Sequence, residues 1–238
     1  MRAVVLQPTY LPWMGYFGMM DETDVFVFYD DVQFSVQSWQ QRNKISASQG
    51  WMWLTVPIVR KFGSRINDTR INNSTNWNKK HWESIRQSYS KTPFFEQFAP
   101  IFQEVYENEW EYLTDLNTTL IKKIAGILGL QTKTVLSSEL NIEGMKTERL
   151  VNMLKKIGAD EYISGPGARD YIDVNSFEEN NIKLYWYEFQ HPVYPQIRGE
   201  FIPYLSVIDL LFNTGGEAIR YIREGSQNAL KLDEGCLK

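Results

Sequence analysis

The stretch that decides the fold is QPTYLPWMGYF, residues 7–17, which follows the apolar run Ala3–Leu6. The apolar run predicts a buried β-strand, and residues 18–22 leave room for one or two helical turns after the stretch. A strand, a loop and a helix in this order predict the first unit of a parallel α/β sheet, in which ligands bind at the carboxyl ends of the strands. Two prolines stiffen the loop, so we expect a preformed site.

This loop carries the first candidate ligand-binding residues. The backbone N–H groups at the start of a helix and their partial positive charge suit a phosphate or a carboxylate. A glycine at position 15 would let a ligand approach the backbone closely. The alternative is that the aromatic side chains simply cap a hydrophobic core. The candidate substrate-binding residues in this loop are Gln7, Thr9, Tyr10, Trp13, Gly15 and Tyr16.

The composition narrows the class of protein. A chain of 238 residues is long enough for one large domain or two small ones. The net charge of −4 argues against a nucleic-acid partner, which usually requires a basic excess. The single cysteine, Cys236, excludes an internal disulfide and fits a reducing cytoplasm. The short apolar run at the start does not predict a signal peptide, and no apolar segment is long enough to predict membrane insertion.

The order of predicted elements gives the fold class. We expect an α/β fold with a mostly parallel three-layer sheet, Rossmann-like or nucleotidylyltransferase-like, and a helical insertion at about 73–129. Residues 1–224 are expected to form one domain and residues 225–238 a loose tail. Further strands are predicted at 24–29, 51–59, 132–136, 161–164 and 183–189, with a short returning strand at 65–72. Helices are predicted at 77–90, 94–106, 111–128, 147–157, 205–213 and 217–223.

Two groups of charged residues lie between the second and the third predicted strand. Asp30 and Asp31 end the second strand, where a carboxylate can bind a Mg²⁺ ion together with a nucleotide phosphate, or orient an amine. Arg42, Asn43 and Lys44 lie in a polar segment that predicts a loop, and their side chains suit a phosphate or a carboxylate. The alternatives are a solvated turn for the aspartates and plain surface for the basic group.

A second glycine-containing loop follows the strand at 161–164. Ser164, Gly165 and Gly167 would again place backbone N–H groups at the carboxyl edge of the sheet, facing the first loop, although a simple tight turn is the alternative. Of the two histidines, His191 is the candidate general base, with a structural role as the alternative, and His81 is expected on the surface. One cysteine and two distant histidines do not predict a zinc site, so we expect no metal residues.

Several motifs together resemble those of the WbqC-like family, found in gene clusters for O-antigen and other surface polysaccharides. The resemblance runs from residue 3 to about 215. The motifs that carry it are Gln7–Phe17, Gln41–Ile45, Trp53–Pro57, Tyr89–Phe95, Tyr162–Gly165, Asp170–Ile172 and Tyr194-x-Gln196. The matched residues Asp170, Tyr171 and Gln196 join the candidate substrate-binding set.

The resemblance implies a transferase that modifies a nucleotide-linked amino sugar, with amino-acyl and specifically glycyl transfer as the suggested reaction. On this hypothesis Arg42 and Lys44 neutralise negative charge, and Asp30 or His191 accepts the amine proton. The predicted catalytic residues are therefore His191, Asp30 and Lys44, and the protein is expected in the cytoplasm. Lipopolysaccharide synthesis is the implied process, and a homodimer is left open.

A second, weaker resemblance leads to the alternative functions. Trp13–Tyr16 is similar in position to the His-x-Gly-His loop of nucleotidylyltransferases and pantothenate synthetases, and Ile163–Arg169 is loosely similar to their second phosphate motif. Both histidines are absent here, which counts against adenylation. The alternatives are an ATP-dependent ligase that forms an acyl-adenylate and a nucleotide-sugar-binding accessory protein without activity. ATP and Mg²⁺ remain the open cofactors.

Overall fold

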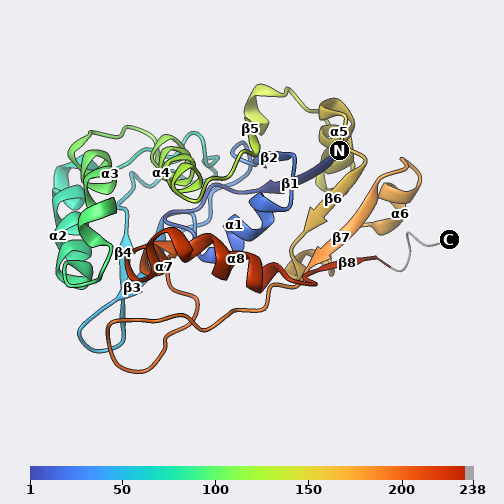
Figure 1. Ribbon diagram of the computed structural model, residues 1–238. Helices are drawn as coiled ribbons and strands as arrows, with labels where there is room; N and C mark the ends of the chain where they lie inside the picture. The colour runs from blue at the N-terminus through green and yellow to red at the C-terminus, as the bar shows by residue number, and fades with distance from the viewer. Residues whose placement is uncertain (234–238) are drawn as a thin grey trace.

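The computed structural model describes residues 1–233 and contains a six-stranded sheet with helices on both faces (Figure 1). The strand order is β5-β2-β1-β6-β7-β8; all neighbours are parallel except β8, which runs antiparallel to β7. The predicted α/β class with a mostly parallel sheet is confirmed. The strands are β1 (Arg2–Leu6), β2 (Val25–Phe28), β5 (Lys133–Leu136), β6 (Glu161–Ser164), β7 (Lys183–Tyr187) and β8 (Leu230–Leu232).

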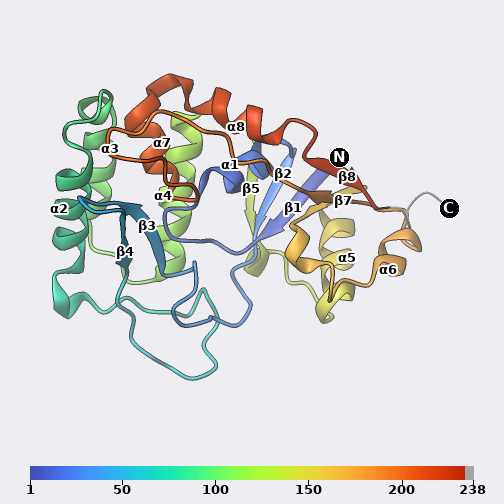
Figure 2. The ribbon, with the colours of Figure 1, turned by 90° about the horizontal axis from the view of Figure 1, so that it is seen from below.

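Alternation along the strands divides the core into two layers. On β2, Phe26 and Phe28 face one core and Val25 and Val27 face the other. The first core lies under α1 (Met14–Asp21), α4 (Leu113–Ile127), α7 (Val207–Thr214) and α8 (Ala218–Ser226). The second core lies under α5 (Lys146–Ile157) and α6 (Val174–Glu178), on the opposite face (Figure 2). Burial on both faces explains why β2 is apolar throughout and why β1 is apolar after Arg2.

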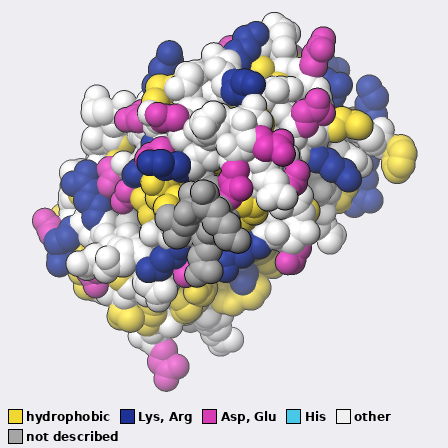
Figure 3. Space-filling model, turned by 90° about the vertical axis from the view of Figure 1, so that its right-hand side faces the viewer, with side chains coloured by type: hydrophobic (Ala, Val, Ile, Leu, Met, Phe, Trp, Pro, Cys, Tyr) yellow, Lys and Arg dark blue, Asp and Glu magenta, His cyan; other side chains and the backbone are white. Residues whose placement is uncertain are grey.

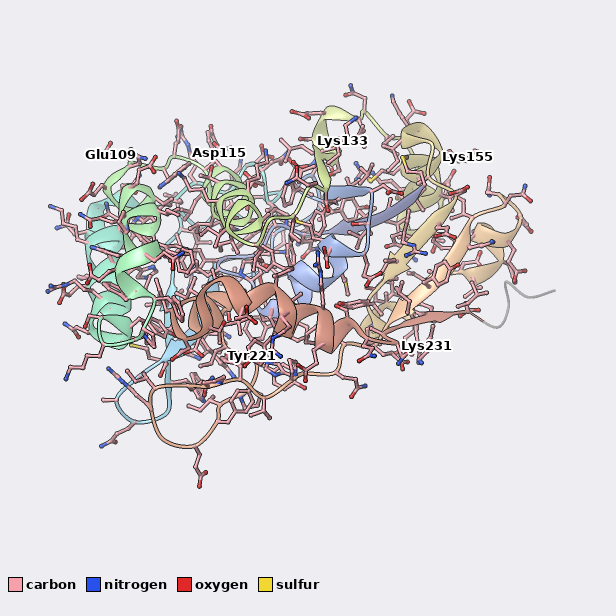
Figure 4. The ribbon with its side chains drawn as sticks, in the orientation of Figure 1. Glu109, Asp115, Lys133, Lys155, Tyr221 and Lys231 are labelled. Atoms are coloured by element: carbon pink, nitrogen blue, oxygen red, sulfur yellow. The ribbon has the colours of Figure 1, made fainter. Side chains whose placement is uncertain are left out.

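The helices α2 (Trp77–Tyr89), α3 (Phe95–Glu107) and α4 lie in the range predicted for the insertion. They form one end of the molecule, marked by Glu109 in Figure 4, and β8 with Lys231 lies at the other end. An antiparallel hairpin of β3 (Arg42–Ser46) and β4 (Trp51–Thr55) packs against α2 and α7. Short 3₁₀ turns occur at Asn73–Thr75, Ser137–Glu139, Pro166–Ala168 and Gly215–Glu217.

Three predictions of local structure differ from what is found. The segment with Arg42 and Lys44 is a strand and not a loop, because its inward residues Asn43 and Ile45 are buried between long polar neighbours that hide the alternation. Residues 65–72 form isolated bridges in place of a strand. The segment expected to be loose contains the end of α8 and all of β8, a strand too short for its pattern to be recognised. Cys236 lies outside the described residues.

The end of the molecule that carries α5, α6 and β8 has basic and acidic side chains interspersed over its surface (Figure 3). No large area of one charge covers this face, which fits the small net charge of the chain. Within residues 1–233, none of the helices is long and apolar enough to cross a lipid bilayer.

We predict that Gly18→Ala destabilises the fold, because α1 packs closely on β7 at this residue. A Cβ atom at Gly18 would lie 2.1 Å from the hydroxyl oxygen of Tyr187, which is buried and hydrogen-bonded to Ser226. Overpacking of this kind costs about 1–3 kcal/mol. Urea unfolding measures the loss. Gly126→Ala on α4 is the matched control: its Cβ would meet nothing within 4 Å, so the change should stabilise by about 0.5–1 kcal/mol. Equal effects of both variants would contradict the close packing.

Candidate functional site

The candidate site lies at the point where the chain reverses the direction in which it adds strands to the sheet. The chain passes from β1 outward to β2 and β5 and then returns to β6 on the other side of β1. The loops after β1 and β6 diverge at such a point and leave a crevice at the carboxyl ends of the strands. A pocket of about 580 Å³, here called the larger pocket, occupies this position. Its polar and glycine lining consists of Gln7, Thr9, Tyr16, Tyr29, Tyr162, Ser164, Gly165, Gly167 and Tyr171.

A second pocket, of about 280 Å³ and here called the smaller pocket, adjoins the first. Thr9 and Tyr16 line both pockets and form the wall between them. The remaining lining of the smaller pocket is Pro12, Trp13, Trp39, Asn43 and Tyr204. The structure therefore brings the two predicted loops together, and it adds Tyr29, Trp39, Tyr162 and Tyr204, which were not among the predicted site residues. A tryptophan within a Gln- and Ser-rich segment was the only sequence signal for Trp39.

The lining of both pockets is uncharged. It contains hydroxyl, amide and aromatic groups, and none of its residues is Asp, Glu, His, Lys or Arg. Burial raises the pKa of the Tyr16 hydroxyl well above its usual value, so this group stays protonated and donates to the carbonyl oxygen of Gln7 at 3.2 Å. Such a lining can hydrogen-bond and stack on a ligand, and it supplies no strong acid or base of its own.

Amide side chains hold the loop after β1 in place. Asn117 on α4 donates to the carbonyl oxygen of Pro8 at 3.1 Å, and Asn43 on β3 donates to those of Leu11 at 2.7 Å and Tyr10 at 3.3 Å. The N–H of Val207 at the start of α7 donates to the carbonyl of Pro12. These bonds from the hairpin, the insertion and α7 make the crevice a preformed feature.

Tyr10 lies in the core and outside both pockets. Its fully buried hydroxyl is hydrogen-bonded to His81 Nδ1 at 2.8 Å and to the hydroxyl of Tyr106 at 2.5 Å. The expectation that His81 lies on the surface is wrong, because its side chain is 7% exposed and burial lowers its pKa to about 4. The spacing Trp77, His81, Ile85 placed it on the apolar stripe of α2 and was the signal to follow.

Gly15 makes room for an indole ring. A Cβ atom at Gly15 would lie 2.4 Å from the six-membered ring of Trp13, so glycine is required here by Trp13 and not by a ligand. The indole in turn stacks on His191, with 6.3 Å between ring centroids. His191 Nδ1 donates to the carbonyl of Pro192, and its Nε2 accepts the N–H of Tyr204 at 3.1 Å. Burial lowers the pKa of His191, and both ring nitrogens are engaged, which favours a positioning role at the smaller pocket.

The two aspartates tie β2 to the end of β5. Asp30 is buried and accepts hydrogen bonds from the hydroxyls of Ser137 and Ser138 and from the N–H of Ser138. Asp31 forms an ion pair with Arg149 on α5. Neither aspartate lines either of the two pockets, and these contacts favour a structural role for both.

The other candidate residues also lie outside the two pocket linings. Arg42 and Lys44 lie on the outer face of the hairpin, over Trp53 and Trp51. Gln196 donates to Asp209 Oδ2 at 2.9 Å and to the carbonyl of Ile202, and Asp170 is exposed. Among residues 1–233, no group of three or more His, Cys, Asp or Glu side chains is placed to hold a metal ion.

The fold and the crevice define an α/β protein with a preformed, uncharged two-pocket crevice at the switch point of its sheet. The model of the WbqC-like protein family matches residues 7–221, and the chain belongs to this family. It is 38% identical over 226 residues to the uncharacterized protein Rv1507c of Mycobacterium tuberculosis, an alignment that covers 93% of this chain and 97% of that relative. No solved structure matches the chain.

We predict that Asn117→Ala destabilises the loop after β1. The change leaves the carbonyl groups of Pro8 and Gln40 without their donor, at a cost of about 1–3 kcal/mol. Urea unfolding gives the loss, and hydrogen exchange should show faster exchange within residues 7–12. Asn152→Ala is the control, because Asn152 on α5 also donates to a carbonyl but at the surface; we expect a change within about 0.5 kcal/mol. Unchanged stability of Asn117→Ala would contradict the clamp.

We predict opposite pH dependences for two buried groups. Burial raises the pKa of Asp209 to about 6, so the folded state binds more protons than the unfolded state between pH 4 and 6. The stability of the wild type relative to Asp209→Asn should therefore fall by about 3 kcal/mol as the pH rises through this window. For His81, whose pKa is lowered, we expect the opposite pH dependence. Relative to His81→Gln, the stability of the wild type should rise as the pH increases from 4 to 6.5. Denaturant unfolding at several pH values measures both, and equal slopes would contradict the assignment.

Proposed function

We propose that the crevice binds a nucleotide-linked amino sugar and that the protein transfers an amino-acyl group, such as glycyl, to the sugar amine during surface-polysaccharide (O-antigen) synthesis. The observation that carries this proposal is the pair of adjoining uncharged pockets at the switch point of the sheet. The larger pocket has the volume for a nucleoside, and the smaller, aromatic-lined pocket has the volume for a sugar ring. Membership of the WbqC-like family is consistent with this function.

Each part of such a ligand has a matching group in the crevice. Tyr171 presents an exposed ring at the larger pocket, on which a base can stack. The site of a Cβ on Gly167 is open, with no heavy atom within 4 Å, so a ligand can approach the backbone there. Thr9, which lines both pockets, places a hydroxyl group where the diphosphate would pass.

The reaction needs little from the side chains themselves. The sugar amine attacks the acyl carbon, a C–N bond forms, and the bond between the acyl group and its carrier breaks. The carrier leaves with the electron pair, and the amine gives up a proton. A site that holds amine and acyl carbon in contact accelerates this step through orientation alone. The catalytic roles of His191, Asp30 and Lys44 stay predictions, since none of the three lines either of the two pockets.

The uncharged lining favours a second candidate, a protein that binds the nucleotide sugar without converting it. Formation of an acyl-adenylate from ATP is less favoured, because Trp13 and Tyr16 stand where similar enzymes have histidines. The cytoplasmic location and a homodimer stay predictions.

One experiment separates these functions. The full chain is incubated with UDP- and dTDP-linked amino sugars and an activated glycine, and the sugar is analysed by mass spectrometry, with calorimetry on the same sugars and on ATP. A glycyl-sugar product supports the transferase, and binding without product supports the accessory protein. Release of pyrophosphate from ATP with glycine would overturn both in favour of the ligase.

We predict that Thr9→Val weakens binding of the nucleotide amino sugar by about tenfold, because an isosteric change removes one hydrogen-bonding hydroxyl from the wall between the pockets. Calorimetry measures the dissociation constant. Thr75→Val on an exposed 3₁₀ turn is the control and should bind as the wild type does. Equal affinity of Thr9→Val and wild type would place the ligand elsewhere.

A further inference from the structure

The outer face of the β3–β4 hairpin forms a separate surface next to the crevice. This surface, here called the hairpin face, consists of Trp39, Arg42, Lys44, Trp51 and Trp53. Alternation places its hairpin members: Asn43 and Ile45 of β3 point into the core, so Arg42 and Lys44 point outward, on the same face as their cross-strand neighbours Trp51 and Trp53. Trp39 lies just before β3 and joins this face through its ring contact with Trp53.

The members of the hairpin face touch one another in a continuous row. The Trp53 ring lies 5.5 Å from the rings of both Trp39 and Trp51, measured between centroids. The Arg42 guanidinium lies 4.2 Å from the centroid of Trp53, and Lys44 Nζ lies 4.2 Å from that of Trp51. Cation–π contacts hold both cations against the rings in this row.

The hairpin face leaves aromatic surface exposed to solvent, and its two cations lack an acidic partner among the described residues. Trp39 is 50% exposed and Trp51 is 43% exposed, although large indoles normally bury most of their surface. Within residues 1–233, neither Arg42 nor Lys44 has an acidic side chain within ion-pair distance, in a chain whose net charge is −4. A cluster of two cations and three rings without an acidic partner is complementary to a ligand that has both negative charge and a flat ring.

The chemistry distinguishes between ligand classes. A neutral sugar would need the rings but not the cations, and inorganic phosphate would need the cations but not the rings. A nucleotide needs both, because bases stack on aromatic side chains and phosphates pair with Arg and Lys. Trp39 belongs to the hairpin face and also lines the smaller pocket, so a ligand on this face ends beside the proposed sugar site.

We propose that the hairpin face binds the adenosine-phosphate part of the acyl donor. Many activated acyl groups, including acyl-adenylates and coenzyme A thioesters, are carried on an adenosine phosphate. With that part on the hairpin face, the acyl group reaches past Trp39 into the smaller pocket, where the sugar amine lies. This inference rests on the proposed function, and it assigns to Arg42 and Lys44 a ligand different from the nucleotide in the larger pocket.

The test is calorimetry of the full chain with ADP, adenosine and pyrophosphate as probes. ADP should bind at least about tenfold more tightly than either of the other two, because only ADP meets both the rings and the cations. The variants Arg42→Gln/Lys44→Gln and Trp51→Ser should each weaken ADP binding by about tenfold while their urea unfolding stays that of the wild type.

The control is Lys133→Gln/Lys155→Gln, which removes the same charge from β5 and α5, far from the hairpin (Figure 4). It should leave ADP binding unchanged. Equal weakening by the control would show a general charge effect, and pyrophosphate as tight as ADP would show an anion site without ring recognition. A neutral oligosaccharide that displaces ADP would show a saccharide site. Each of these results overturns the proposal.

Different results would overturn the donor site on the hairpin face and the proposed function of the crevice. ADP binding that responds to Thr9→Val but not to Arg42→Gln/Lys44→Gln would place ADP in the crevice and overturn the donor site. Binding of the nucleotide amino sugar without any binding of ADP also overturns the donor site and leaves the proposed function standing. ADP on the hairpin face together with no nucleotide-sugar binding would instead overturn the proposed function and retain a nucleotide site.

Discussion

The hydrogen bonds to the carbonyl groups of residues 8–12 are the constraint on which the crevice depends. This segment turns inward between β1 and α1, so its carbonyl oxygens are removed from water and need donors. Asn43, Asn117 and the N–H of Val207 supply them, from β3, α4 and α7. Three parts of the chain that are remote in sequence are therefore required to shape one loop. The helical insertion and the hairpin act as a brace for the site and extend the first hydrophobic core.

The same brace explains the character of the crevice. The side chain of Tyr10 points from the loop into the core, and its hydroxyl is hydrogen-bonded to both His81 and Tyr106 of the insertion. These bonds attach the loop firmly to the helices. On the other side, His191 orders Tyr204 and stacks on Trp13. The titratable residues near the crevice are thus used to position its walls, and the walls themselves are uncharged. Such walls can hydrogen-bond a ligand and stack on it without a charged group of their own.

Sequence reasoning reached the sheet, the insertion and the two loops because each has a strong local signal: apolar runs, helical spacing, and proline or glycine at strand ends. It missed β3, whose alternation is hidden among polar side chains, and β8, which at three residues is too short for a pattern to be recognised. It also gave chemical roles to Asp30 and His191 by residue type, although the serines after β5 surround Asp30 and the N–H of Tyr204 donates to His191. Hydrogen-bond partners that come from another part of the chain cannot be recognised from the sequence next to the residue that they contact.

The sequence by itself determined the α/β class, the place of the two loops at the carboxyl edge of the sheet, and family membership through its motifs, because these follow from local patterns. Only the tertiary structure decided which motif residues line the crevice and which support it. Gly15 makes room for the ring of Trp13, and Tyr10 is hydrogen-bonded in the core. Arg42 and Lys44 pack on a row of indoles on the hairpin. The physical reason is that burial and hydrogen-bond partners are set by packing between distant segments, and this packing assigns each side chain its surroundings.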